Sequence, residues 1–253
     1  MSELALKNVG MRYGDTVVLE RLNLTLTPGT FCAVVGASGA GKSTILKLLL
    51  SELTPSEGSI TLGGRPLPQE PGPERGVVYQ RYSVFPHLTA LENVCFGLER
   101  TQGDPLFGRT WGAKRRALCA EARNLLDAVG LLAAADRYPG ALSGGMQQRL
   151  ALAQTLALKP ELLLLDEPFG ALDPGNKQTA HALLKQLWSE RGMTVVMVTH
   201  DLSEAFTLGT RVIVLDKVRE DPHSPERFGA SITYDLPVDR SAPPEAASVP
   251  HVS

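Results

Sequence analysis

Five short stretches of the chain are continuously apolar and end at a polar or turn residue. They cover residues 31–35, 76–80, 162–166, 194–200 and 211–216. Strands without apolar-polar alternation are typically buried on both faces, as in a parallel sheet covered by helices. Residues 4–13 and 60–64 instead have the pattern of antiparallel strands, with turns at 13–15 and 63–64. The pattern predicts an α/β core with an antiparallel β flank.

Helical signals replace strand signals between Gln80 and Pro160. Thr89 and Glu92 form a capping box, and apolar residues recur at helical spacing over residues 113–129, closed by Gly130. We expect residues 82–159 to form a helical subdomain inserted in the core. The core would then consist of residues 1–81 and 160–216, and residues 217–253 would form a C-terminal extension. The Pro-, Ala- and Ser-rich tail after Pro237 is expected to be disordered.

Composition narrows the class of protein only slightly. The 253 residues have a formal net charge of -2, so no general electrostatic field favours a nucleic-acid partner. Cys32, Cys95 and Cys119 lack CxxC spacing and are interpreted as buried small hydrophobes in a reducing cytosol. The chain has neither a secretory leader pattern nor an apolar run of about 18 to 20 residues, so we expect a soluble protein.

The segment GASGAGKST, at residues 36–44, follows one apolar strand and precedes an apolar helix. This strand-loop-helix context is that of a P-loop, in which backbone N–H groups and a helix N-terminus surround a phosphate. Lys42 should reach the β- and γ-phosphates, and the Ser43 hydroxyl should bind Mg²⁺. The expected nucleotide contacts are Gly36, Ala37, Ser38, Gly39, Ala40, Gly41, Lys42, Ser43 and Thr44.

Polar residues at three strand ends are candidates for the chemistry. Asp166 would hold Mg²⁺ and Glu167 would orient and deprotonate the attacking water, although two acids could also mark a plain solvent-facing strand end. Gln80 could contact the metal or the water, and His200 could bond the γ-phosphate. Either one could instead be a local cap. The carboxyl ends of parallel strands share the edge where ligands bind.

The order of these motifs resembles that of the ATP-binding-cassette (ABC) ATPases over residues 3–216. The resemblance includes LSGGMQQR at residues 142–149 and ALD at residues 171–173. It implies a P-loop NTPase (RecA-like) fold, ATP and Mg²⁺ as ligands, and ATP hydrolysis. It also implies that Tyr13 stacks on adenine, where the alternative is a core tyrosine.

LSGGMQQR has two glycines where a helix is expected to begin. Since glycine is a poor helix former, this placement indicates that backbone N–H groups are needed there. The resemblance implies that Ser143, Gly144 and Gly145 contact the γ-phosphate held by a second copy of the chain. Two ATP molecules would lie between two-fold related subunits, with Asp173 at the interface.

The resemblance also indicates a membrane partner. Residues 80–98 are expected to contain a docking segment for the transmembrane permease subunits, with Tyr82, Phe85, Pro86 and His87 lining a groove. A buried loop anchor is the alternative. The chain would lie on the cytoplasmic face of the membrane and would serve a solute-binding protein indirectly.

Among transporters, LSGGMQQR and DEPFGALD resemble importers of the nitrate, sulfonate and taurine type. Residues 214–238 resemble cassettes linked to small nitrogen compounds such as guanidine or urea. Two other classes stay open: an ABC-type ATPase acting on nucleic acid or ribosomes, and a nucleotide-binding regulator without hydrolysis. The chain has neither the coiled-coil insertions nor the second P-loop expected of the first class. The presence of Asp166, Glu167 and His200 disfavours the second class.

Overall fold

The computed structural model describes residues 2–80, 83–102, 112–170, 172–219, 221, 223–224 and 226–238. Its main sheet has the strand order β10-β9-β3-β8-β7-β6. Every neighbouring pair in this sheet is parallel except β9 and β10. Its strands are β3 (Phe31–Gly36), β6 (Arg75–Val78), β7 (Leu162–Asp166), β8 (Thr194–Val198), β9 (Arg211–Asp216) and β10 (Ser231–Pro237).

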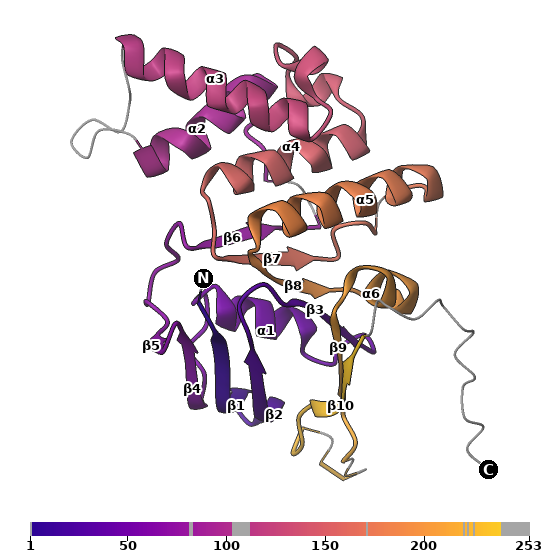
Figure 1. Ribbon diagram of the computed structural model, residues 1–253. Coiled ribbons are helices and arrows are strands. Elements are labelled where there is room, and N and C mark those ends of the chain that lie inside the picture. The colour runs from indigo at the N-terminus through magenta and orange to yellow at the C-terminus, as the bar shows by residue number, and fades with distance from the viewer. Residues whose placement is uncertain are drawn as a thin grey trace.

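The second sheet is antiparallel, with the order β2-β1-β4-β5. Its strands are β1 (Leu4–Tyr13), β2 (Thr16–Leu26), β4 (Glu57–Leu62) and β5 (Arg65–Pro66). Figure 1 shows helix α1 (Lys42–Leu49) between the two sheets, and helices α2 (Ala90–Gln102), α3 (Gly112–Ala128) and α4 (Gly144–Ala157) on the far side of the main sheet. The predicted α/β core with an antiparallel flank is therefore confirmed.

The main sheet is buried on both faces, which explains its uninterrupted apolar strands. In β3, Phe31, Ala33 and Val35 pack into the core on the helical side. The alternate residues Cys32 and Val34 pack into the core formed with the antiparallel sheet and α1. Because successive side chains of a strand point to opposite faces, both sets must be apolar.

The predicted helices form where expected. Glu92 accepts the backbone N–H of Thr89 at 2.8 Å, and the Thr89 hydroxyl accepts that of Glu92 at 3.2 Å, which closes the capping box. Two short 3-10 turns, Leu132–Ala134 and Pro139–Ala141, precede α4. The remaining helices are α5 (Pro174–Arg191) and α6 (Leu202–Leu208). The predicted boundary at 81/82 lies outside the described residues, so the division into domains stays a prediction.

Three sequence expectations differ from the structure. Two strands end earlier than expected, because β6 and β8 stop two residues before Gln80 and His200. Strand β10 lies in the C-terminal extension and was not predicted; residues 239–253 lie outside the described part. Cys32 is buried as expected, but Cys95 and Cys119 are only partly buried, so that interpretation was wrong for two of the three thiols.

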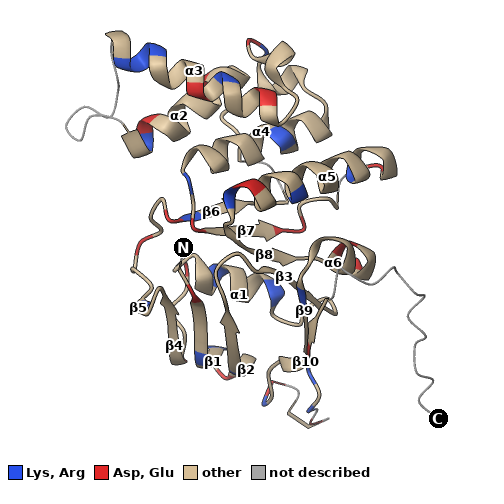
Figure 2. Ribbon diagram, in the orientation of Figure 1, with Lys and Arg blue, Asp and Glu red and all other residues tan. Residues whose placement is uncertain are grey.

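Basic and acidic residues are interspersed along the described ribbon (Figure 2), in keeping with the small net charge of -2. Among the described residues, no helix combines the length and the apolar character needed to cross a membrane.

Candidate active site

The loop between β3 and α1 has the backbone shape of an anion site. Gly39 (φ +82°) and Gly41 (φ +79°) adopt left-handed conformations that residues with a Cβ rarely adopt. Gly41 also precedes the first turn of α1, so no side chain caps that helix end. The Lys42 ammonium donates to the carbonyl oxygens of Gly36 at 2.7 Å and Ala37 at 2.8 Å. The loop thus brings a cation and a helix N-terminus to one place.

A cleft of about 410 Å³ opens above this loop. It brings Glu167 and His200, which are far from the loop in sequence, beside Lys42. Gly36, Ala37 and Ala40, expected as contacts, are not among its lining residues. Those residues are Val18, Ser38, Gly39, Gly41, Lys42, Ser43, Thr44, Glu167 and His200.

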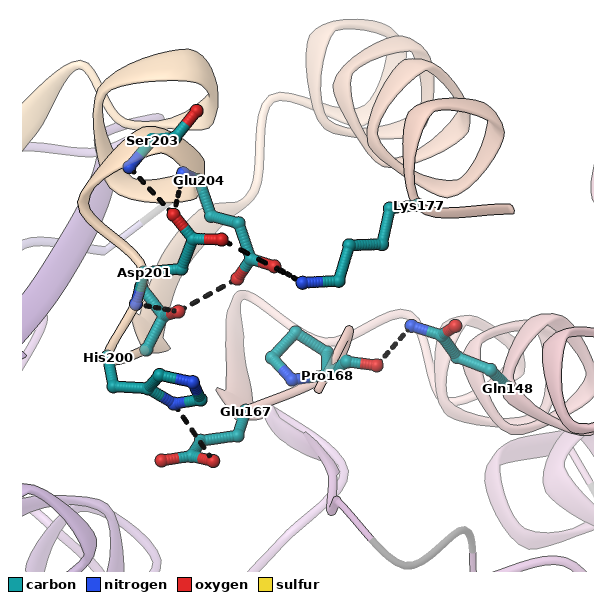
Figure 3. A network of polar contacts seen from close by, with 9 residues as sticks. Gln148, Glu167, Pro168, Lys177, His200, Asp201, Ser203 and Glu204 are labelled. Atoms are coloured by element: carbon teal, nitrogen blue, oxygen red, sulfur yellow. Dashed lines mark hydrogen bonds and ion pairs between the residues drawn. The ribbon is translucent and has the colours of Figure 1, made fainter. Parts of the chain in front are cut away.

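Glu167 and His200 lie together in this cleft. His200 Nδ1 is 3.3 Å from Glu167 Oε2, and Figure 3 shows the imidazole directed at the carboxylate. Glu167 has a φ of +44°, and its backbone N–H donates to the Val198 carbonyl at 2.9 Å. A left-handed residue other than glycine costs about 1–3 kcal/mol, so the fold holds Glu167 in this position under strain.

Asp166 ends strand β7 and is half-buried. Burial is the main cause that raises the pKa of its carboxyl, and the neighbouring Glu167 raises it further, while Lys47 and Lys42 act in the opposite direction. The side chain of Glu167 is 26 % exposed. The alternative of a plain solvent-facing strand end therefore does not describe this pair.

Gln80 is exposed and lies near Glu167 without lining the cleft. A Cβ placed on Gly170 would be 3.6 Å from Gln80 Nε2 and 3.9 Å from Glu167 Oε2. The two side chains therefore approach the same point. Gln80, two residues past the end of β6, is thus brought to the side of the site where Glu167 presents its carboxylate.

Sequence reasoning missed a polar network behind His200. The carboxylate of Glu204, which is 4 % exposed, accepts from Lys177 Nζ at 2.8 Å and from the Thr199 hydroxyl at 2.8 Å. Lys177 Nζ is also 3.8 Å from Asp201, whose backbone N–H donates to the Thr199 hydroxyl at 3.0 Å. Figure 3 shows this network between α5 and the start of α6. It fixes the residues on either side of His200.

A second contact missed from the sequence reaches the segment after Glu167. Gln148 on α4 is buried, and its side-chain amide donates to the Pro168 carbonyl (Figure 3). Within the described residues, Gln148 Oε1 has no hydrogen-bond partner. The signal in the sequence was a glutamine among mostly apolar residues of this helix. The contact joins the LSGGMQQR helix to the residue that follows Glu167.

Ser143 and Asp173 lie at exposed helix starts. Ser143 caps α4 by accepting the Met146 backbone N–H at 3.4 Å, and Asp173 caps α5 by accepting that of Asn176 at 3.1 Å. The Asn176 side-chain amide is the first cause that lowers the pKa of Asp173. None of Ser143, Gly144 and Asp173 belongs to the described lining of the cleft in the same chain. Their exposure leaves them available to another molecule.

Gly145, which follows Ser143 and Gly144 at the start of α4, is only partly exposed. A Cβ placed on Gly145 would be 3.6 Å from the Leu172 side chain. Gly145 does not line the cleft of its own chain either.

Tyr13 ends β1 with 46 % of its surface exposed, so the alternative of a core tyrosine is wrong.

The docking segment is partly anchored and partly exposed. The Phe85 ring packs edge-on against the Phe96 ring, with the two ring centroids 4.8 Å apart. The Phe85 backbone N–H donates to Asn93 Oδ1 at 2.8 Å. Pro86 and His87 are exposed. Phe96, which is 40 % exposed, was missed from the sequence, and Tyr82 lies outside the described residues. The anchor interpretation therefore fits Phe85, whereas the groove at Pro86 and His87 stays a prediction.

A hollow of about 290 Å³ adjoins this segment between β6, α2 and α4. Its lining combines aromatic, polar and basic side chains. They include Tyr79, Ser83, Phe96, Arg100 and Gln154.

Comparison with known proteins gives a consistent result. Residues 19–170 match the family model described as ABC transporter. The chain is 40 % identical to the bicarbonate transport ATP-binding protein CmpD of Synechocystis, over 94 % of this chain and 81 % of that protein. It is also 40 % identical to the nitrate import ATP-binding protein NrtD of Synechocystis, over 93 % and 82 %.

A solved structure supports the same fold. The dimeric, post-hydrolysis structure of the ATP-binding cassette MJ0796 bound to ADP and Pi superimposes with a TM-score of 0.72. The two sequences are 30 % identical, and the match covers 93 % of this chain and 99 % of that one.

Proposed function

Because this chain belongs to the ABC transporter family and is an ATPase of that family, we propose that it powers an importer of a small solute. The observation that carries the proposal is the approach of His200 to Glu167, 3.3 Å apart, in the cleft that Lys42 lines. The relatives named for bicarbonate transport and nitrate import favour a small anion as the solute. The guanidine or urea alternative rests only on residues 214–238.

Residues in the cleft and beside it have distinct tasks in the proposed mechanism. Lys42 and the N-terminus of α1 bind the β- and γ-phosphates, and Tyr13 stacks on adenine. Glu167 orients the attacking water and accepts its proton, while His200 donates to the γ-phosphate. The His200–Glu167 contact keeps the carboxylate directed into the cleft. Gln80 approaches the same carboxylate and senses the water.

The residues present fit a Mg²⁺ ion. Burial raises the pKa of the Asp166 carboxyl, and the adjacent Glu167 carboxylate raises it further. A divalent cation would relieve the repulsion between these two carboxylates. Asp166, the Ser43 hydroxyl and the Gln80 amide oxygen are the oxygen donors that would hold it. When bound with ATP, the ion would neutralise charge on the phosphates.

A second copy would complete the site. The first turn of α4 exposes Ser143 and Gly144 and continues at Gly145, and none of the three lines the cleft of its own chain. ATP held by Lys42 of one chain would meet this helix N-terminus of the other, with Asp173 beside the interface. The dimeric cassette that the chain resembles supports this arrangement.

The membrane partner would dock beside the helical part of the chain. We place the permease subunits at Tyr82, Phe85, Pro86 and His87, on the cytoplasmic face of the membrane, with the solute-binding protein acting through the permease. The neighbouring hollow, which Phe96 lines, offers an apolar side chain to a helix of that partner.

Two variants test the two-chain site. Glu167→Gln should bind ATP and form an ATP-dependent dimer while losing turnover, as measured by phosphate release and by light scattering in Mg-ATP. Ser143→Arg, whose own P-loop is intact, should neither dimerise nor hydrolyse. If Ser143→Arg hydrolyses normally as a monomer, the proposed partner contact is wrong. Normal hydrolysis by Glu167→Gln would remove Glu167 as the base.

A further inference from the structure

Two cysteines outside the proposed ATP site face each other across a helix pair. Cys95 on α2 and Cys119 on α3 lie 24 positions apart, and their Sγ atoms are 3.6 Å apart, with Cys95 donating its S–H. Both are partly exposed, whereas Cys32 is fully buried. Water-borne reagents can therefore reach this pair but not Cys32.

The two helices hold the sulfurs in register. Gln102 near the end of α2 donates its side-chain amide to Glu121 of α3 at 3.1 Å, two residues beyond Cys119. Leu98, three residues after Cys95 on α2, is completely buried in the core shared by the two helices. A disulfide has an S–S bond of about 2.05 Å, so the sulfurs need to approach by only about 1.5 Å.

We propose that Cys95 and Cys119 are an oxidation site, at which a small-molecule disulfide converts the two thiols into a bond between α2 and α3. The Cys119 thiolate attacks one sulfur of the reagent and displaces one small thiolate. Cys95 loses its proton to solvent, and its sulfur attacks Cys119 Sγ and displaces the second small thiolate. Two protein thiols and one small disulfide thus yield one protein disulfide and two small thiols.

The contact between the sulfurs assigns different parts to the two residues. Burial, and next its hydrogen bond to Cys119, raise the pKa of Cys95 to about 12. Since the thiolate is the attacking species and the Cys95 proton is held in the hydrogen bond to Cys119, Cys95 reacts slowly with the reagent. Cys119, which accepts that hydrogen bond, forms the mixed disulfide first.

The bond would act on the docking segment, a consequence that rests on the proposed function. The Asn93 side chain of α2 holds the backbone of Phe85. Its Oδ1 accepts the Phe85 N–H at 2.8 Å, and its Nδ2 donates to the Phe85 carbonyl oxygen at 3.1 Å. Phe96, which follows Cys95, packs against Phe85. Tying α2 to α3 therefore limits the movement of the helix that carries the segment.

The experiment treats the full chain with oxidised glutathione and then counts free thiols in denaturant. Of three thiols in the reduced chain, only Cys32 should remain, and peptide mapping without reductant should show the 95–119 link in a monomer. Cys32→Ser is the matched control and should form the same link. Cys95→Ser should accumulate a glutathione adduct on Cys119, and Cys119→Ser should react several-fold more slowly.

The outcomes separate this site from the proposed function. Adducts on wild-type Cys95 and Cys119 without a link, or a link only between two chains, would overturn the proposal. So would full retention of all three thiols. A 95–119 link that leaves permease binding unchanged supports the oxidation site and removes only its effect on docking.

Discussion

The Lys177 ammonium lies 2.8 Å from Glu204 and joins the helix that begins after Asp173 to the residues around His200. Glu204 is buried, and breaking its pair would leave a carboxylate with one partner fewer. We expect Lys177→Met to lower the free energy of unfolding by about 2 kcal/mol. The resulting displacement of His200 should lower kcat for ATP hydrolysis by about 10- to 100-fold.

Steady-state ATPase assays and urea unfolding check this prediction. Because the change acts through the position of His200, kcat should fall while KM for ATP changes little. Lys177→Arg, which retains the charge, should recover most of the activity. Lys114→Met, at an exposed position of α3, is the control and should change neither quantity. A loss of stability with unchanged kcat would reduce Lys177 to a structural role.

The left-handed backbone of Glu167 (φ +44°) predicts an unusual order of stability among its variants. Glu167→Ala and Glu167→Gly both remove the carboxylate, but only glycine adopts this conformation without a steric cost. The glycine variant should be more stable than the alanine variant by about 1 kcal/mol, and both should lack turnover. Urea unfolding of the two proteins measures the difference.

Asp166 supplies the control for this comparison. It ends a regular strand, where glycine is the less favourable residue, so Asp166→Gly should be less stable than Asp166→Ala. If alanine is the more stable residue at both positions, the backbone of Glu167 is not strained.

Local patterns in the sequence were sufficient for much of the fold. The capping box at Thr89 and Glu92 formed as predicted because its partners are three residues apart. Strands β3, β7 and β9 were found because burial on both faces requires uninterrupted apolar residues. The meeting of Glu167 and Lys42 also followed from the sequence, since both flank the carboxyl ends of parallel strands.

Contacts set by packing were not predictable in this way. Lys177 and Glu204 are 27 positions apart, and neither has a neighbour that indicates the other. The 24-residue separation of Cys95 and Cys119 likewise becomes a contact only once α2 packs on α3. Glu167 has no local sequence signal for its φ, because a left-handed residue other than glycine is imposed by its surroundings.

Gly97 lies where α2 packs tightly against α4. A Cβ at this position would be 2.8 Å from the Gln154 carbonyl oxygen and 3.0 Å from Ala157 Cβ. Alanine favours helix by about 1 kcal/mol over glycine, but overpacking of this kind costs about 1–3 kcal/mol. We expect Gly97→Ala to destabilise the chain by about 1 kcal/mol.

Thermal or urea unfolding tests this change against Gly140→Ala, where a new Cβ would have no neighbour within 4 Å. Gly140→Ala should leave the midpoint nearly unchanged. A stabilised Gly97→Ala would mean that α2 and α4 separate at little cost.

The ion pair between Arg211 and Asp235 joins β9 to β10, with an Nε–Oδ1 distance of 2.7 Å and an Nη2–Oδ2 distance of 2.6 Å. This pair predicts that the free energy of unfolding depends on pH. Its hydrogen bonds lower the pKa of Asp235 below the usual 3.8. The folded chain therefore binds this proton less readily than the unfolded chain does. The stabilisation is complete above the unfolded pKa and is lost as pH falls through the folded one. Because the carboxylate is 36 % exposed, it should contribute only about 0.5–1 kcal/mol.

Urea unfolding of wild type and Asp235→Asn between pH 7 and pH 3 measures this contribution. Wild type should be the more stable protein at pH 7, and the difference should narrow on acidification, because protonated aspartic acid resembles asparagine in charge. Asp127→Asn, at an exposed position of α3, should show no comparable narrowing. A difference that stays constant down to pH 3 would show that Asp235 acts through packing or neutral hydrogen bonds, so that β10 is held on β9 by its backbone ladder.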